Sequence, residues 1–248
     1  IALVVAFTPG AHALAIATGL AFVVVNAAIV RRQSTAFTLL MLLASASFAL
    51  GTTLWALGQP VPHVVLAWLC FFVLTIVAER LELARLTRTP TWATRAIVAL
   101  GVGLVVASAG ISCAGVVEDA RADTVASVIG PRLIGAVFVA VAAWQLRFDV
   151  ARRTIRGHGL PRFAAVGVLL GAGWLAVSGA VLLVAALPPA GPIYDAVLHA
   201  VFVGFTLSMV FAHAPIILPA VARVHVPYHA SLYAPLALLH TGLVLRIL

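Results

Sequence analysis

Two histidines lie within one long apolar segment, YDAVLHAVFVGFTLSMVFAHAPIILP, which covers residues 194–219. His199 and His213 are separated by nearly four turns of an α-helix, so we expect both imidazoles on one side of the helix, roughly 21 Å apart along its axis. A histidine at membrane depth is energetically expensive and usually faces a protein interior, where it marks a functional site. The spacing therefore favours one helix that serves two haem or metal sites, one toward each face of a bilayer.

Four histidines are predicted to lie toward the outer face of the membrane: His12, His63, His199 and His240. His199 and His240 have similar estimated depths on consecutive antiparallel segments. Neutral imidazole ligates both haem iron and copper, so these two side chains are predicted to be axial ligands of one haem b or two ligands of a copper ion. His12 and His63 are candidate additional metal ligands.

Arg132, in VIGPRLIGA, is the arginine with the greatest predicted depth. A haem propionate is one candidate partner for it, and Asp195 is another. Asp195 also lies one turn before His199, where a carboxylate can orient an imidazole.

A second site is predicted toward the inner face from Met209 and His213, which lie four residues apart on one helical face. Methionine and histidine together ligate haem or copper. The remaining ligand is expected from His225, His229 or another helix. Pro215 and Pro219 are expected to break the helix just beyond His213.

Each of these side chains also has a purely structural interpretation. A membrane histidine can simply donate a hydrogen bond to a backbone carbonyl, and Met209 alone is typical core filling. His12 and His63 are also explained by solvation at the membrane interface. Glu79 and Glu82 lie beside Arg80 and Arg85 and are expected to form local ion pairs, with proton entry through Glu79 as the alternative.

The composition is that of an integral membrane protein. The chain has 248 residues, of which 64% are hydrophobic and 9% charged, with a mean hydropathy of +1.18. Its net charge of +8 comes from arginines near segment ends, which indicates orientation in a membrane rather than nucleic-acid binding. Two cysteines suggest no disulfide framework, and the first residue, Ile1, favours an incomplete N-terminus.

Apolar runs predict a single all-α domain over 1–248, a polytopic bundle of about eight transmembrane helices. The predicted spans are 11–30, 36–57, 63–83, 94–117, 124–146, 163–187, 193–214 and 231–247. Basic residues cluster in every second connection, so the start of the chain is predicted outside a bacterial plasma membrane. Glycines in the sixth span favour close helix packing.

The pattern HAxFxGFxxSMxxxHAPxIxP at 199–219, with ERLEL at 79–83, resembles uncharacterised bacterial multi-span proteins. It is also distantly similar to NnrS-type haem–copper membrane proteins, relatives of the haem–copper oxidases. The resemblance implies haem, with copper as a further cofactor, held by histidines of a helical bundle. This chain has fewer spans than those families and lacks the adjacent His–His and His-x-His pairs of the oxidases, so we do not expect it to reduce oxygen alone.

These observations favour a haem- or copper-binding membrane protein in electron transfer or in handling of NO or O2. A transporter for a small solute or metal ion is the first alternative, and a non-catalytic subunit of a larger membrane complex is the second. The lipid bilayer is the expected partner, with complex subunits or a redox partner beside it. Phosphate-binding loops, HExxH and Ser–His–Asp patterns are absent from the sequence, which argues against an ATPase, a zincin or a serine protease. Whether the protein is an enzyme stays open.

Overall fold

The computed structural model describes residues 9–85, 89–114, 124–185, 187–223 and 227–247. Within these ranges the regular structure is entirely helical. Eight helical segments are sufficiently long and apolar to cross a bilayer. The predicted all-α bundle is therefore confirmed. The elements follow in the order α2 (Pro9–Arg32), α3 (Ala36–Ala56), α4 (Val61–Ala84), α5 (Thr91–Ala114), η2 (Val125–Ile129), α7 (Gly130–Phe148), α8 (Ala151–Thr154), α9 (Gly159–Val184), α10 (Pro192–His199), η3 (Ala200–Leu207), α11 (Ser208–Ala222), η4 (Ala230–Leu232) and α12 (Tyr233–Ile247).

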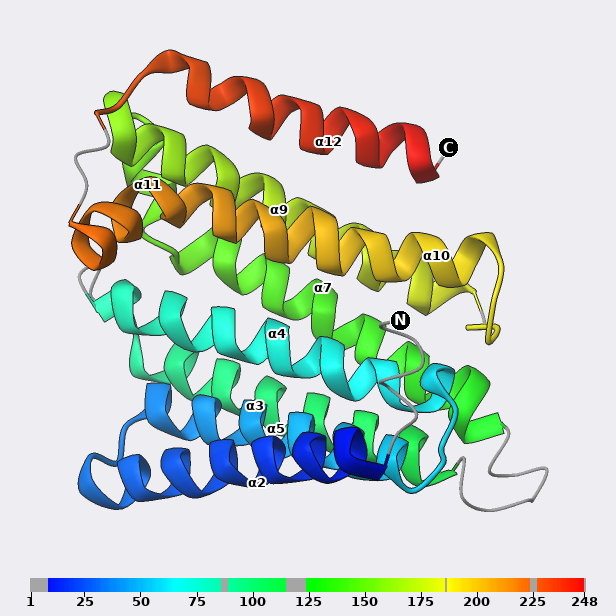
Figure 1. The fold of residues 1–248 in the computed structure, drawn as a ribbon. Helices are drawn as coiled ribbons and strands as arrows, with labels where there is room; N and C mark the ends of the chain where they lie inside the picture. The colour runs from blue at the N-terminus through cyan, green and yellow to red at the C-terminus, as the bar shows by residue number, and fades with distance from the viewer. Residues whose placement is uncertain (1–8, 86–88, 115–123, 186, 224–226, 248) are drawn as a thin grey trace.

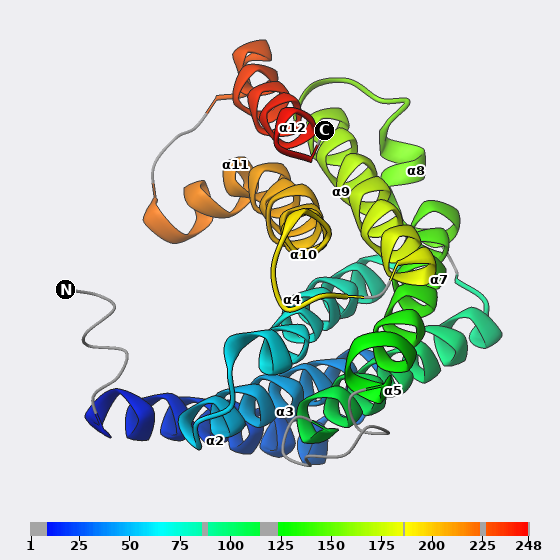
Figure 2. The same ribbon diagram turned by 90° about the vertical axis from the view of Figure 1, so that its right-hand side faces the viewer.

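The helices form two groups that meet along α4, α5 and α7. Helices α2 to α5 pack together, and the second group contains α7, α9, the continuous α10–η3–α11 helix and α12. Figure 2 shows the α10–η3–α11 helix lying between α4 on one side and α9 and α12 on the other. Arginine-bearing ends of α2, α4 and α7 share one end of the bundle, on the left in Figure 1, which we call the basic end.

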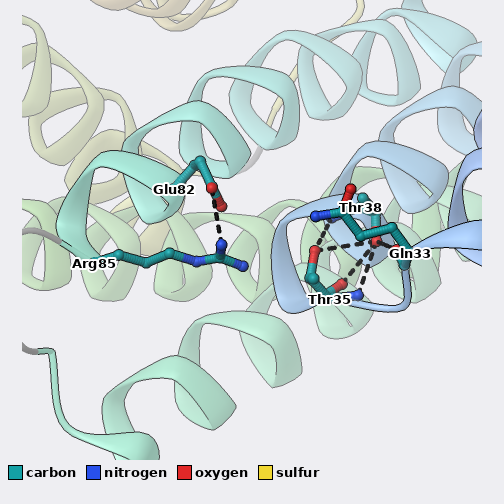
Figure 3. Close-up of polar contacts among 5 residues, drawn as sticks. All are labelled: Gln33, Thr35, Thr38, Glu82 and Arg85. Atoms are coloured by element: carbon teal, nitrogen blue, oxygen red, sulfur yellow. Dashed lines mark hydrogen bonds and ion pairs between the residues drawn. The ribbon is translucent and has the colours of Figure 1, made fainter.

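A short turn at the basic end joins α2 to α3. The hydroxyl of Thr35 accepts the backbone N–H of Thr38 at 3.2 Å, and the hydroxyl of Thr38 accepts the N–H of Thr35 at 3.0 Å (Figure 3). The Thr38 hydroxyl also donates to the carbonyl of Gln33 at 2.7 Å. These bonds satisfy N–H groups that have no partner within the helix, so they fix where α3 begins.

Removing this cap is expected to destabilise the protein measurably. Thr35→Ala should lower the free energy of unfolding by about 1 kcal/mol, the usual contribution of an N-cap side chain. Thermal unfolding of the purified protein in detergent measures it, and Thr35→Ser, which keeps the hydroxyl, is the control. Equal losses in the two variants would contradict a capping role.

Close packing of α7 on α9 depends on two glycines. A Cβ atom on Gly179 would lie 2.7 Å from the carbonyl oxygen of Gly135, and a Cβ on Gly135 would lie 2.7 Å from the carbonyl oxygen of Gly179. Gly167 makes a similar approach to Ala212 of α11. The predicted role of the glycines in the sixth span is thus confirmed for Gly167 and Gly179, because only a residue without a side chain permits these backbone distances.

The helix that carries His199 and His213 departs from the expected α-helix in two ways. Its central eight residues, Ala200–Leu207, form a π-helix, which has more residues in each turn than an α-helix. The helix also continues through Pro215 and Pro219 to Ala222 and ends at Arg223, whose φ is 53°. The expected break after His213 is wrong: the helix bends instead (Figure 2), as proline-containing membrane helices do when neighbours support them.

The π-helix also makes the prediction of a shared histidine face wrong. A wider turn rotates each successive residue less, so eight such residues shift the direction of the following side chains by a large fraction of a turn. His199 lies beside Asp195, which pairs with Arg246 of α12, whereas His213 contacts Arg80 of α4. The two imidazoles therefore face different neighbouring helices.

Candidate functional site

A buried arginine lies at the basic end, where the two groups of helices meet. Arg80, one turn before the end of α4, is 3% exposed. Its Nη2 donates to Oε1 of Glu79 at 2.9 Å and lies 2.6 Å from Nε2 of His213 on α11. An ionisable side chain buried in a membrane-spanning helix is costly unless paired, and such residues mark ion or substrate pathways.

The contacts of His213 define its neutral tautomer. Its Nδ1 lies 2.6 Å from the carbonyl oxygen of Met209, an acceptor, so Nδ1 carries the proton. Nε2 then has a lone pair, which accepts the hydrogen bond from Arg80. Oε1 of Glu79 lies 3.8 Å from the same nitrogen. Arg80 therefore joins a carboxylate of its own helix to an imidazole of α11.

Asp149 completes this group from the second set of helices. It directly follows α7, is 2% exposed, and accepts the backbone N–H of Ala151 on Oδ1 at 2.7 Å. It interacts electrostatically with Arg80, His213 and Glu79. Burial nevertheless raises the pKa of Asp149 above its usual value, because the low dielectric of the site disfavours the charged form. We call Glu79, Arg80, Asp149 and His213 the Arg80 cluster.

Two buried atoms of the Arg80 cluster make no hydrogen bond within the described part of the chain. These are Nε of Arg80 and Oδ2 of Asp149. Buried polar groups are nearly always satisfied, so unpaired ones indicate a site that binds water, a proton or a ligand.

A cavity of about 420 Å³ adjoins the Arg80 cluster. Glu79, Arg80 and His213 form its polar end. Apart from Thr154, the rest of its wall is apolar. It comes from α4, α8 and the residue before it, α9 and α11, and includes Leu83, Val150, Leu160, Ala164, Val168, Ile216 and Ile217. An apolar cavity with a few convergent polar groups is the usual form of a small-molecule site.

The raised pKa of Asp149 gives a pH prediction. A carboxyl group whose pKa is higher in the folded state binds its proton more tightly there, so its stabilisation is complete at acidic pH and is lost as the pH rises through the folded pKa. Asp149→Asn should therefore gain thermal stability relative to the native protein as the pH increases from acidic to neutral. Melting temperatures of both proteins across this pH range test the expectation, and a constant difference would contradict it.

A second arginine on α4 provides a natural comparison. Arg85 donates to Glu82 at 2.9 Å, and both side chains are exposed, at 53% and 41% (Figure 3). The predicted local ion pairs of Glu79 and Glu82 are thus confirmed. Of these two pairs, the one with Arg80 has a buried guanidinium and an exposed carboxylate, since Arg80 is 3% and Glu79 51% exposed, and Arg80 also contacts His213 on another helix.

His240 does not lie with His199. The indole N–H of Trp174 on α9 donates to its Nδ1 at 2.8 Å, the two rings are parallel within 3°, and Nε2 lies 3.4 Å from the hydroxyl of Ser208. Ser208 is nine residues beyond His199, about two turns further along the helix. The predicted match in depth between His199 and His240 is therefore wrong.

His199 and Asp195 form a cluster with α12 at the end of the bundle opposite the basic end. Nδ1 of His199 lies 2.9 Å from the backbone carbonyl of Asp195 and 3.3 Å from its carboxylate. Arg246 of α12 donates to both carboxylate oxygens of Asp195, at 2.9 and 3.0 Å. The partner of Asp195 is thus Arg246 rather than Arg132, which is exposed on α7.

Met209 and His213, predicted as a ligand pair, interact only through the backbone carbonyl of Met209, which the imidazole of His213 contacts. The Met209 side chain is buried near Gly171 of α9, whereas the imidazole of His213 points to α4. His229 is exposed, and its Nδ1 accepts the N–H of Ser231, which caps the turn before α12. His225 lies outside the described residues.

The two remaining candidate metal ligands occupy the end opposite the basic end. His12 packs edge-on against Trp55, with ring centroids 4.8 Å apart. The carbonyl of His63 accepts the Ser112 hydroxyl at 3.0 Å, and its Nδ1 is buried without a hydrogen bond among the described residues.

The structure does not bring together the residue pairs that were predicted to hold haem or copper. Across the described ranges, no three His, Cys, Asp or Glu residues come close enough together to hold a metal ion. In its neutral form His240 uses the Nδ1 lone pair for Trp174, which leaves the proton on Nε2, and the lone pair of His213 accepts from Arg80. Neither imidazole offers a lone pair to a metal in this arrangement.

Sequence reasoning missed the importance of Arg80, Asp149 and Arg246. Arg80 and Asp149 resemble ordinary basic and acidic residues at helix ends. One feature of the sequence could have pointed to Arg80: Glu79 and Arg80 are adjacent charged residues in a largely apolar helix. Two adjacent residues point to different sides of a helix, so one of the two charges lies toward its packed face.

Comparison with known proteins identifies a family. A family model described as a domain of unknown function, DUF8744, matches residues 1–248. No curated protein and no solved structure matches the chain.

Proposed function

We propose that this chain, which belongs to the DUF8744 family, is a membrane transporter that exchanges protons for a small organic monocation. The Arg80 cluster, in which Arg80 and Asp149 are buried, beside a mostly apolar cavity is the observation that carries the proposal. Buried chains of Asp, Glu and His residues serve as proton relays in transporters. The cavity supplies the complementary surface for an apolar molecular body.

The charges of the Arg80 cluster favour a positively charged solute. With His213 neutral, the positive charge of Arg80 is balanced by Glu79, its direct partner. The cluster is then neutral when Asp149 is protonated and carries one negative charge when Asp149 is ionised. A cation in the adjacent cavity therefore stabilises ionised Asp149 and promotes release of its proton.

Proton exchange follows from this competition. In the solute-free state, burial raises the pKa of Asp149 and so favours its protonated form. When the cation enters, Asp149 loses its proton and the net charge of the occupied site is unchanged. When the cation leaves, the proton returns. The location of the cavity between the two groups of helices suits a site whose access changes when the groups move relative to each other.

Uptake by reconstituted protein tests the proposal. Purified protein in liposomes with an acidic interior should accumulate ethidium, a planar organic monocation, faster than protein-free liposomes do. Asp149→Asn should lower this rate about tenfold and remove its dependence on the pH gradient, since a loss of about 1.4 kcal/mol gives that factor. Rates equal to those of protein-free liposomes would refute cation exchange.

A further inference from the structure

A second cavity lies at the basic end and is unlike the first. It has a volume of about 610 Å³ and is bordered by the ends of α5, α7 and α8. Four arginines border it, Arg147, Arg152, Arg153 and Arg156, together with Thr89 and Asp149. We call it the arginine pocket. None of the ion pairs found within the described ranges involves any of these four arginines.

The local structure explains how the arginines converge. The Asp149 carboxylate accepts the N–H of Ala151, which begins the short helix α8 directly after α7. Nη1 of Arg152 donates to the carbonyl of Arg147 at 3.2 Å. The guanidinium of Arg147 lies over the ring of Phe148, 5.2 Å from its centroid. The chain reversal thus places guanidinium groups from two consecutive helices around one space.

Aromatic residues place the arginine pocket at the level of lipid head groups. Trp92, at the start of α5, is 63% exposed and packs edge-on against Phe148 with ring centroids 5.4 Å apart. Exposed tryptophans are enriched at the membrane–water interface. Basic pockets between helices at this depth suit anionic head groups, because a guanidinium can donate two parallel hydrogen bonds to a phosphate.

We infer that the arginine pocket binds a phosphate ester, and the position of Trp92 favours the head group of an anionic phospholipid as its source. The alternative explanation is that the arginines act only as diffuse determinants of membrane orientation. That explanation requires positive charge near the membrane but no particular cavity. A matched pair of variants separates the two.

The test uses full-length protein in mixed micelles that contain equal amounts of phosphatidylglycerol and phosphatidylcholine with identical acyl chains. Native mass spectrometry should show retained phosphatidylglycerol in excess over phosphatidylcholine by about tenfold. The double variant Arg152→Gln/Arg153→Gln should reduce that excess at least about fivefold, as should Arg156→Gln, which also borders the pocket. The control is Arg31→Gln/Arg32→Gln, which removes two adjacent arginines at the end of α2, outside the pocket, and should leave the excess unchanged.

Three results would overturn the inference. Equal losses in the pocket and control variants would show diffuse attraction. Equal retention of the two lipids by the native protein would show that no head-group site exists. Protection against thermal unfolding by inorganic phosphate as strong as that by phosphatidylglycerol would assign the pocket to a free anion rather than a lipid. Size-exclusion profiles identify any variant that fails to fold, and Arg156→Gln then carries the test.

Discussion

Arg80→Gln is expected to lower pH-driven ethidium uptake by at least about tenfold, equivalent to about 1.4 kcal/mol or more. Glutamine keeps a donor for His213 but removes the charge that balances Glu79. The cluster beside the cavity then carries one more net negative charge, so a bound cation is held more tightly and released more slowly. Initial rates in proteoliposomes at matched protein density provide the measurement.

Arg85→Gln is the matched control for this prediction. It removes an arginine from the same end of α4, but that arginine is exposed and pairs only with Glu82 (Figure 3). Exposed ion pairs contribute little to stability, so this variant should fold and transport like the native protein. Equal uptake by Arg80→Gln and Arg85→Gln would show that the Arg80 cluster takes no part in transport.

Gly179→Ala is expected to cause a large loss of stability from a single added methyl group. The new Cβ would lie 2.7 Å from the Gly135 carbonyl oxygen and 2.9 Å from the backbone nitrogen of Val139. These are backbone atoms of α7, which cannot move aside as a flexible side chain can. The helices must separate, and overpacking of this kind costs about 1–3 kcal/mol. Thermal unfolding in detergent measures the loss.

Gly173→Ala provides the control on the same helix. A Cβ at Gly173 meets no atom within 4 Å, so the substitution adds only the better helix propensity of alanine, about 1 kcal/mol. This variant should be as stable as the native protein or more so. If both variants lost stability equally, the effect would come from the helix itself rather than from contact between α7 and α9.

The helical architecture was predictable because long apolar runs separated by short polar connections form transmembrane helices in a bilayer. The eight spans follow from length and hydropathy, and Gly167 and Gly179 pack as their small size suggests. The directions of His199 and His213 were not predictable, since AVFVGFTL carries no residue that distinguishes a π-helix from an α-helix. The smaller rotation at each of the eight π-helical residues accumulates into a different helix face.

The Arg80 cluster was not predictable for a different reason. Arg80 and Arg85 have the same residue type, the same helix and a glutamate close by. Their difference arises from the contact of Arg80 with His213 and its electrostatic interaction with Asp149, both of which lie far away in the sequence. A single sequence places residues along helices but does not determine which helices become neighbours.

Because of the π-helical segment, the contacts of His213 depend on the exact number of residues that precede it in the membrane helix. A single-residue deletion between Ala200 and Leu207 would tighten one turn and rotate all the following side chains about the helix axis. His213 would then lose its contact with Arg80 and face another helix. Such a deletion preserves hydropathy and span length almost perfectly. It would thus yield a chain that inserts and folds as before while its buried charges lose their partner.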